Sequence, residues 1–362
     1  MAPPTPRSSR TRTGDADLDR LLQEILERVA PTHDRDVLLD ILVSAVRLAG
    51  DDADRLDLKI TSAALKEMRA AFGAFAPYRH IPKVTIFGSA RTASHDPSYE
   101  QAKALAAALA SNGWMVVTGA GPGIMAAGLE GAGREHAFGV NIRLPHEQGA
   151  NEFIAGDPKL VSMKYFFTRK LMLLKESQGF VSLPGGVGTL DETFELLTLI
   201  QTGKADPAPI VLLDQPGGTF WQGLLRFLHD DVLPRGLIDE NDLELFLITD
   251  DVAVATEELL SFVRNYRSIR WVGKLLVIRM EHAPTDAELA ELDTEFGTLS
   301  ADGHLRRSEP LPAEIADGDG VDLARLVLRY DGFQSGRLHR LIKALNHPPS
   351  LDSLDKPANS RK

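Results

Sequence analysis

The sequence predicts an α/β protein built on a doubly wound parallel sheet, and three observations indicate this fold class. Short apolar runs such as KVTIF and WMVVT recur through the middle of the chain. Stretches with the apolar spacing of helices separate them. Several of the runs end in glycine. Strands buried on both faces are apolar throughout and need crossover helices, so this alternation predicts a Rossmann-like core over residues 81–266.

The elements of this core follow one another regularly. Five β-rich runs are expected, namely KVTIFGSA, WMVVTGAGPG, AFGVNIRLP, GFVSLPGGVG and APIVLLD. Helices are expected between or after them, at about 98–111, 123–135, 164–176 and 189–202.

Both ends of the chain add to the core. Residues 17–80 have helical apolar spacing and predict an N-terminal extension of two or three helices. Residues 267–346 predict a small C-terminal α/β unit of two strands and two helices. We expect its basic cluster, Arg337, His339, Arg340 and Lys343, to form a solvated helix face. Residues 1–16 and 347–362 are rich in Pro, Ser and charge and predict disordered tails.

Composition limits the classes of function. The chain has 362 residues, with 43% hydrophobic and 25% charged residues, as in folded globular proteins. Its net charge of −11 disfavours a nucleic-acid partner. The absence of cysteine excludes disulfides, zinc-thiolate sites and thiol nucleophiles. No apolar run suits a membrane span or a signal peptide, so we expect a cytoplasmic protein without a membrane partner.

Glycine-rich turns follow three of the expected strands. They occupy residues 87–91, 118–123 and 184–189. Ligands of open parallel sheets bind beyond the carboxyl ends of the strands, and backbone amides of such turns hold phosphate well. A tight turn alone can also require glycine. Three such turns in one sheet favour a ligand site.

Two familiar nucleotide motifs are absent. The G-x-G-x-x-G pattern fails at Ile124, and no acidic residue ends the next strand, which disfavours NAD and FAD. The P-loop pattern is also missing, which disfavours an ATPase or kinase. A phosphate site here is more typical of mononucleotide binding.

Acidic and basic side chains accompany the third turn. Thr189 and Glu192 have the spacing of a helix capping box, which is one explanation of this glutamate. Glu195 lies on the same helical face, and two carboxylates beside a phosphate loop suit ribose binding or activation of water. Arg169 precedes them and suits a phosphate clamp or a partner for a catalytic carboxylate. We regard the nearby Lys164 and Lys170 as surface charges from the residues alone.

Three segments together resemble the LOG ("Lonely Guy") family. They are GAGPGIM at 119–125, FFTRK at 166–170 and PGGVGTLDE at 184–192, within a resemblance that covers residues 81–215. It implies a nucleoside 5′-monophosphate phosphoribohydrolase, which releases a free base and ribose 5-phosphate. Cytokinin riboside monophosphates and AMP are the family's usual substrates, and the older label lysine decarboxylase finds no support in these residues.

The resemblance implies roles for individual residues. Arg169 and Glu192 fall on catalytic positions, and we expect Glu195 to support Glu192 or to contact the sugar. Expected substrate-binding residues are Gly88, Ser89, Gly119, Gly121, Gly123, Met125, Lys170, Gly185, Gly186, Gly188 and Thr189. Neither a metal nor an organic cofactor is expected. The second loop has Ala120 and Ala126 where the family more often has glycine.

Alternatives remain for function and assembly. The same superfamily includes carriers that hold a nucleotide or cofactor without cleaving it. A carboxylate beside an anion site favours the enzyme, because a passive phosphate carrier has no use for it. Apolar helix faces suggest a homo-oligomer, a dimer or larger. A sensor role for the C-terminal unit rests only on its α/β pattern, and the preferred base stays open.

Overall fold

The computed structural model describes residues 12–29, 34–143, 149–332 and 334–354. It divides into two compact units, Met1–Met68 and Arg69–Lys362. Most of the two predicted tails lies outside the described residues, although helix α14, Pro349–Leu354, occupies part of the second one. In the described part of the chain, no helix combines the length and apolarity needed to cross a bilayer.

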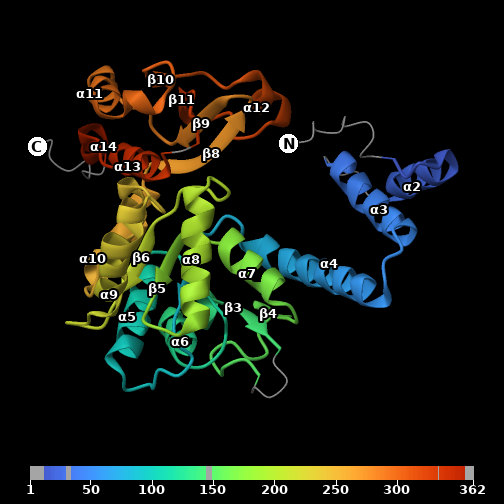
Figure 1. Ribbon diagram of the computed structural model, residues 1–362, viewed down its shortest axis with the longest axis horizontal. Coiled ribbons are helices and arrows are strands. Elements are labelled where there is room, and N and C mark those ends of the chain that lie inside the picture. The colour runs from blue at the N-terminus through green and yellow to red at the C-terminus, as the bar shows by residue number, and fades with distance from the viewer. Residues whose placement is uncertain (1–11, 30–33, 144–148, 333, 355–362) are drawn as a thin grey trace, which may run out of the picture. The chain divides into compact units, whose positions relative to one another are not determined.

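The first unit is helical. It contains α2, Ala16–Arg28, α3, Arg35–Gly50, and most of α4, Arg55–Phe75 (Figure 1). Asp15 begins α2 by accepting hydrogen bonds from the backbone amides of Asp17 and Leu18. The three helices agree with the apolar spacing of this segment.

The second unit contains a seven-stranded parallel sheet. The strand order is β4-β3-β2-β1-β5-β6-β7, with every neighbouring pair parallel. This confirms the doubly wound fold. The strands are β1 (Lys83–Phe87), β2 (Met115–Thr118), β3 (Ala137–Ile142), β4 (Leu160–Met163), β5 (Gly179–Ser182), β6 (Ile210–Leu213) and β7 (Leu247–Thr249). The sequence did not reveal β4 and β7, because these edge strands are only partly buried and lack the continuous apolar runs of the inner strands, and β7 has only three residues.

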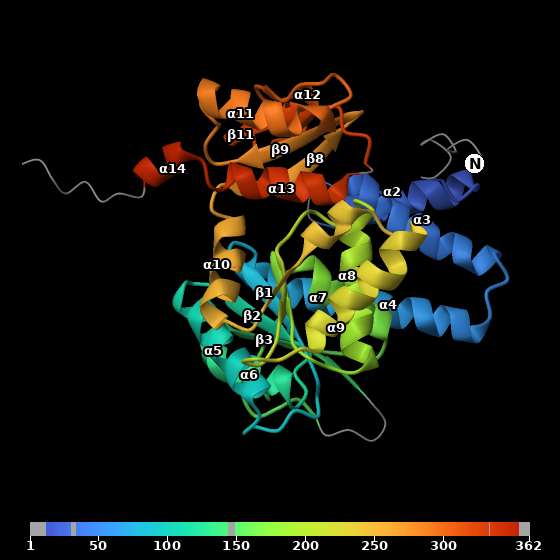
Figure 2. The same cartoon turned by 60° about the vertical axis from the view of Figure 1, so that its left-hand side comes forward.

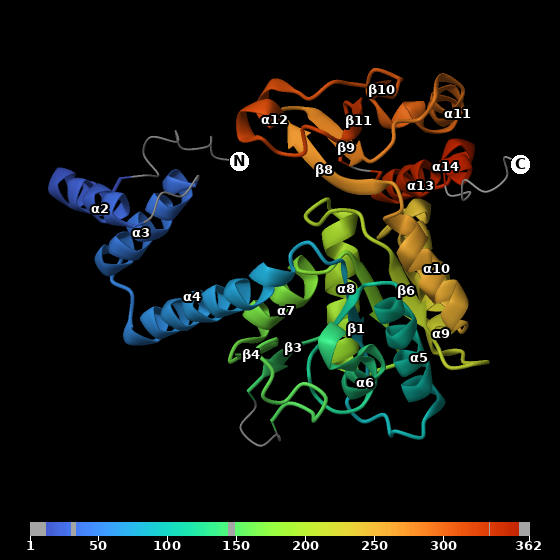
Figure 3. The same cartoon turned by 180° about the vertical axis from the view of Figure 1, so that it is seen from behind.

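Helices cover both faces of this sheet. One face carries α5, α6 and α10, whose apolar residues share a core cluster with β1, β2, β5 and β6. Figure 1 shows α7 and α8 in front of the sheet, and Figure 3 shows α5, α6 and α10 on the opposite side. The helices are α5 (Pro97–Ser111), α6 (Ile124–His136), α7 (Phe166–Lys175), α8 (Val187–Gln201), α9 (Phe220–Phe227) and α10 (Val252–Phe262). Short 3-10 or π turns are η1 (Ala76–Tyr78), η2 (Leu228–Val232), η3 (Leu233–Arg235), η4 (Glu240–Leu245) and η5 (Gly297–Leu299).

The strand order reverses between β1 and β5. The chain adds β2, β3 and β4 on one side of β1, then returns to its other side with β5. The crevice at such a switch point is where doubly wound proteins bind ligands. The glycine turns after β1 and β5 therefore flank this crevice.

A second, antiparallel sheet follows in the order β10-β11-β9-β8. It was predicted with two strands, and the structure adds β8 and β10, since β8 mixes polar and apolar residues and β10 has only two residues. Helix α13 lies between this sheet and the α/β core (Figure 2). The elements are β8 (Tyr266–Val272), β9 (Leu275–Met280), α11 (Asp286–Phe296), β10 (Arg306–Arg307), α12 (Pro312–Asp317), β11 (Ala324–Leu328) and α13 (Ser335–Leu345).

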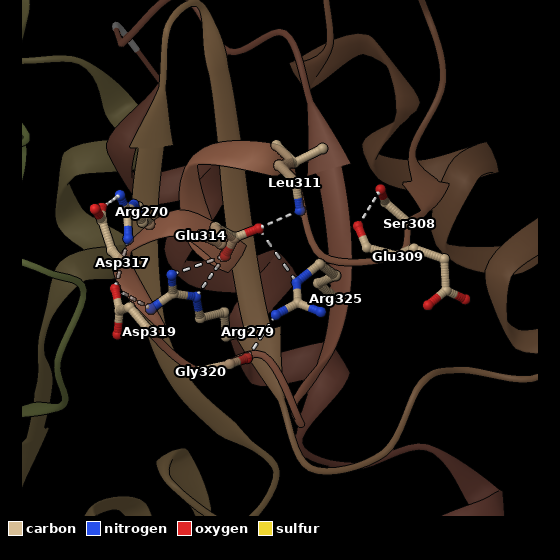
Figure 4. A network of polar contacts seen from close by, with 10 residues as sticks. All are labelled: Arg270, Arg279, Ser308, Glu309, Leu311, Glu314, Asp317, Asp319, Gly320 and Arg325. Atoms are coloured by element: carbon tan, nitrogen blue, oxygen red, sulfur yellow. Dashed lines mark hydrogen bonds and ion pairs between the residues drawn. The ribbon is translucent and has the colours of Figure 1, made fainter.

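A buried ion network joins α12 to this sheet (Figure 4). The Glu314 carboxylate accepts hydrogen bonds from Arg279 Nε at 2.9 Å and Nη2 at 2.7 Å, and its other oxygen lies 3.5 Å from Arg325 Nε. All three side chains are at least 95% buried. One carboxylate thus neutralises two buried cations only in part, and Asp319 also binds Arg279.

His339 corrects one sequence expectation. The predicted solvated face of α13 holds for Arg340, which is exposed, whereas His339 is buried and its ring lies 4.7 Å from that of Phe262. Burial lowers the pKa of His339 to about 3. The imidazole is therefore a neutral core side chain at physiological pH.

Candidate active site

A cavity of about 620 Å³ lies at the switch point of the parallel sheet. Residues after β1, β2 and β5 line it together with the starts of α7 and α8. Of the residues predicted from the sequence, the lining includes Gly88, Ser89, Gly119, Met125, Arg169, Gly186, Gly188, Thr189 and Glu192. The others, Gly121, Gly123, Lys170, Gly185 and Glu195, lie outside the lining.

The turn after β1 packs closely on the start of α6. The carbonyl oxygen of Ser89 accepts a hydrogen bond from the Ile124 amide at 3.0 Å. A Cβ on Gly88 would lie 2.5 Å from the Ile124 side chain. Gly123 has φ +66°, and a Cβ there would lie 2.3 Å from the Ser89 oxygen. Gly123 therefore does not line the cavity itself but allows the turn with Ser89, which does, to pack closely on α6.

Gly119 leaves space for the guanidinium of Arg169, which comes from α7. A Cβ on Gly119 would lie 1.9 Å from Arg169 Nη2 and 2.6 Å from Met125 Sδ. A side chain at this position would displace the guanidinium, so the observed arrangement requires glycine here. Gly121 similarly makes room for Met125, since a Cβ on it would lie 2.6 Å from the methionine methyl.

The first turn of α8 offers backbone amides to the cavity. Gly186 is the N-cap and, among the described residues, no side chain caps the helix. Gly186, Val187, Gly188 and Thr189 all line the cavity. The first amides of a helix lack partners within the helix and attract anions. This turn can thus hold an anionic group.

The capping box predicted for Thr189 and Glu192 does not form. Helix α8 begins at Val187, so Thr189 is already its third residue. The Thr189 side chain packs instead on Gly185, where a Cβ would lie 2.2 Å from the hydroxyl oxygen. Glu192 is consequently available for the cavity rather than for the helix end.

Arg169 and Glu192 face each other across the cavity floor. Arg169 Nη1 lies 3.8 Å from Glu192 Oε1, and their side chains are only 11% and 17% exposed. Arg169 Nε donates a hydrogen bond to the Val140 carbonyl at 3.0 Å, which fixes the guanidinium on β3. The arginine is a positioned cation beside a carboxylate that still has room to bind a ligand.

Burial raises the pKa of Glu192. The attraction of Arg169 and then of Lys170 offsets part of this shift. A carboxyl group with a raised pKa is a better proton acceptor than an exposed one and occurs frequently at catalytic sites. Glu192 combines this property with a place in the cavity.

Glu195 and Lys170 form a separate cluster. Lys170 Nζ lies 2.5 Å from Glu195 Oε2 and 2.7 Å from Asp191 Oδ2. Burial would lower the pKa of Lys170, but its hydrogen bonds to Asp191 and Glu195 outweigh this and raise it. This cluster ties α7 to α8, and neither Glu195 nor Lys170 lines the cavity.

Several lining residues were not predicted. Arg91 ends the turn after β1, and Phe166 and Val187 stand at the mouth with exposed fractions of 59% and 84%. Arg91 is the last residue of the glycine turn at 87–91, and a positive charge in a turn expected to hold phosphate was the available signal. Phe166 and Val187 stand in the segments FFTRK and PGGVGTLDE, but apolar side chains resemble core residues in a sequence and were not singled out.

Known proteins resemble part of this chain. A family model described as "Possible lysine decarboxylase" matches residues 117–259. A cytokinin riboside 5′-monophosphate phosphoribohydrolase of Mycobacterium marinum is 31% identical over 160 residues, which cover 44% of this chain and 83% of the relative. The enzyme of the same name from Mycobacterium tuberculosis is 32% identical, covering 45% and 86%. The chain belongs to the LOG family.

The residues matched by the family model, 117–259, lie within the α/β core, so the helical N-terminal unit and the antiparallel sheet lie outside that match. Among solved structures, a molybdenum cofactor binding protein from Rippkaea orientalis aligns with 51% of this chain and 98% of its own, at 17% identity and a TM-score of 0.36.

Proposed function

We propose that this protein hydrolyses the N-glycosidic bond of nucleoside 5′-monophosphates and releases a free base and ribose 5-phosphate. The observation that carries the proposal is the Arg169–Glu192 pair, 3.8 Å apart in a cavity whose wall is the open first turn of α8. An anion site next to a buried carboxylate fits a substrate that has a phosphate and a reacting sugar carbon.

The phosphate binds at the first turn of α8. Its oxygens accept hydrogen bonds from amides in the run 186–189, where the helix dipole also favours negative charge. Arg91, on the opposite turn, adds a second positive group to the lining. Anchoring at this end directs the ribose toward Glu192, one helical turn farther along α8.

Glu192 acts on the ribose and on water. Its carboxylate accepts a proton from a water molecule as the water oxygen bonds to C1′ and the bond from C1′ to the base breaks. The electron pair of that bond leaves with the base, which then takes up the proton. The negative carboxylate also stabilises the positive charge that develops on the sugar.

Arg169 positions the reacting groups. Its hydrogen bond to Val140 and its contact with Glu192 keep one cation at a fixed place in the cavity. That cation holds the carboxylate oriented and lowers its pKa relative to burial alone. Glu195 and Lys170 act indirectly, by joining the two helices that carry the pair.

The names of the relatives support cytokinin riboside 5′-monophosphates as substrates, and AMP shares their phosphate, ribose and adenine ring. The experiment is to incubate the purified protein with AMP, isopentenyladenosine monophosphate and a pyrimidine monophosphate, and to quantify free base by chromatography. We expect release from at least one of them. Saturable binding of all three without release would contradict the hydrolase and support a carrier.

We further propose that a second copy of the chain covers the mouth of the cavity. Phe166 and Val187 at the mouth, with Phe167 and Leu171 on α7, form an exposed apolar surface. Such a surface is typical of protein interfaces. Light scattering should find a dimer or larger assembly that Phe167→Asp weakens. A wild-type monomer at every concentration would contradict this.

A further inference from the structure

A second cavity, of about 160 Å³, lies between the end of α8 and the antiparallel sheet. Ile200 and the loop to β6 form one wall, and residues of β8, β9 and α13 form the other. It is separate from the switch-point cavity, with which it shares no lining residue among those described. The reaction proposed above makes no use of it.

The lining excludes a charged ligand. Side chains such as Ile200, Pro207, Leu276 and Leu338 make it apolar, and no lining residue in the described chain is Asp, Glu, Lys, Arg or His. An ion entering this cavity would lose its hydration without gaining a counter-charge from the lining side chains, which costs several kcal/mol in proteins. A ligand of this cavity is therefore neutral.

Two stacked aromatic rings give the cavity a flat wall. The rings of Trp271 and Tyr330 have centroids 6.1 Å apart and an interplanar angle of 29°. Trp271 is 46% exposed, whereas Trp114 and Trp221 are at most 4% exposed. A large apolar ring left half in water beside an apolar cavity offers a stacking surface for another planar ring.

The volume limits the size of the ligand. An apolar cavity of about 150 Å³ is known to bind benzene. A cavity of about 160 Å³ with an open side thus accepts one aromatic ring, or two fused rings that extend toward Trp271.

We infer that this cavity is a binding site for a small, neutral, planar aromatic or heteroaromatic ligand that stacks on Trp271. Such a ligand contacts α8 at Ile200, eight residues and about 12 Å along the helix from Glu192. The same end of α8 is fastened to the C-terminal region, because Ser335 Oγ donates a hydrogen bond to the Gln201 carbonyl at 2.6 Å.

Calorimetric titration of the full chain tests this inference, with benzimidazole and adenine as neutral probes and benzoate as a charged planar control. Two variants remove the site in different ways. Trp271→Leu removes the stacking ring, and Ala205→Leu fills the cavity while keeping the tryptophan. Ile315→Ala truncates another exposed apolar residue of the C-terminal region, away from the cavity, and is the matched control.

We expect saturable binding of both neutral rings. Trp271→Leu should weaken this binding at least about tenfold, as loss of base stacking typically does, and Ala205→Leu should weaken it at least as much by occupying the cavity. Ile315→Ala should bind as the wild type does, and benzoate should show no binding that these variants affect. Absence of binding by either neutral ring would overturn the inference. Unchanged affinity in both site variants, with melting temperatures near that of the wild type, would overturn it as well.

Discussion

Arg169 occupies space that Gly119 leaves open, since a Cβ on the glycine would lie 1.9 Å from the guanidinium nitrogen. The two residues come from α7 and from the turn after β2, and they are fifty positions apart. The absence of a side chain at Gly119 therefore allows the guanidinium of Arg169 to lie beside Glu192.

Gly119→Ala should reduce base release at least about 100-fold, because a displacement of a positioned catalytic group by about 1 Å has this effect. The fold should persist, since the displaced atoms are the end of a side chain. Steady-state kinetics and thermal melting measure the two effects. Gly223→Ala in α9, where the nearest atom lies 3.9 Å from a new Cβ, is the control. Equal activity of the two variants would contradict the role of Gly119.

Glu195→Gln should retain most activity. Its carboxylate binds Lys170 and is 41% exposed, so the lost ion pair is worth at most about 1 kcal/mol, or about fivefold in kcat/KM. Kinetics of Glu195→Gln beside Glu192→Gln measure this difference. A loss in Glu195→Gln as large as that in Glu192→Gln would place Glu195 in direct contact with the substrate.

Glu192→Gln should stabilise the free protein at neutral pH. The raised pKa means that the folded state holds the Glu192 proton more tightly than the unfolded state does. The ionised carboxylate is thus destabilising above its folded pKa, and this penalty disappears as the pH falls below the unfolded value of about 4.5. Melting temperatures should be higher for the variant at pH 7 and should converge toward pH 4. A variant that is less stable at pH 7 would contradict the raised pKa.

Glu314→Gln should destabilise the protein by about 3–5 kcal/mol, because it leaves Arg279 and Arg325 buried without their shared counter-charge. Asp317→Asn is the matched control, since that carboxylate is 59% exposed and binds only Arg270 among the contacts described here. Denaturant titration followed by circular dichroism measures both. Similar losses of unfolding free energy in the two variants would contradict the larger cost that we assign to the buried charges.

Part of the sheet and part of the cavity lining were predictable from the sequence. Apolar runs and glycine turns predicted five strands and the crevice, since both follow from local backbone needs. Contacts between distant elements were not predictable. The capping box failed because α8 starts at Val187, two residues before Thr189. Glu195 shares a helical face with Glu192. Its carboxylate pairs with Lys170 of the neighbouring helix, and it does not line the cavity.

The antiparallel sheet shows the same limit. Its buried pairs join residues far apart in the chain, such as Arg279 and Glu314, whose charges suggest surface positions in a sequence. His339 likewise resembles its basic neighbours on α13 and is nevertheless in the core. Polar residues buried by tertiary contacts give no periodic signal.

Base release by Glu192→Gln tests the central claim most directly. With AMP or isopentenyladenosine monophosphate, the account predicts a fall in kcat/KM of at least about 10³-fold, within the range that general base catalysis contributes. Calorimetry should show that the variant still binds the nucleotide, because the phosphate site on α8 is intact. Release of base by Glu192→Gln at the wild-type rate would contradict the proposed mechanism.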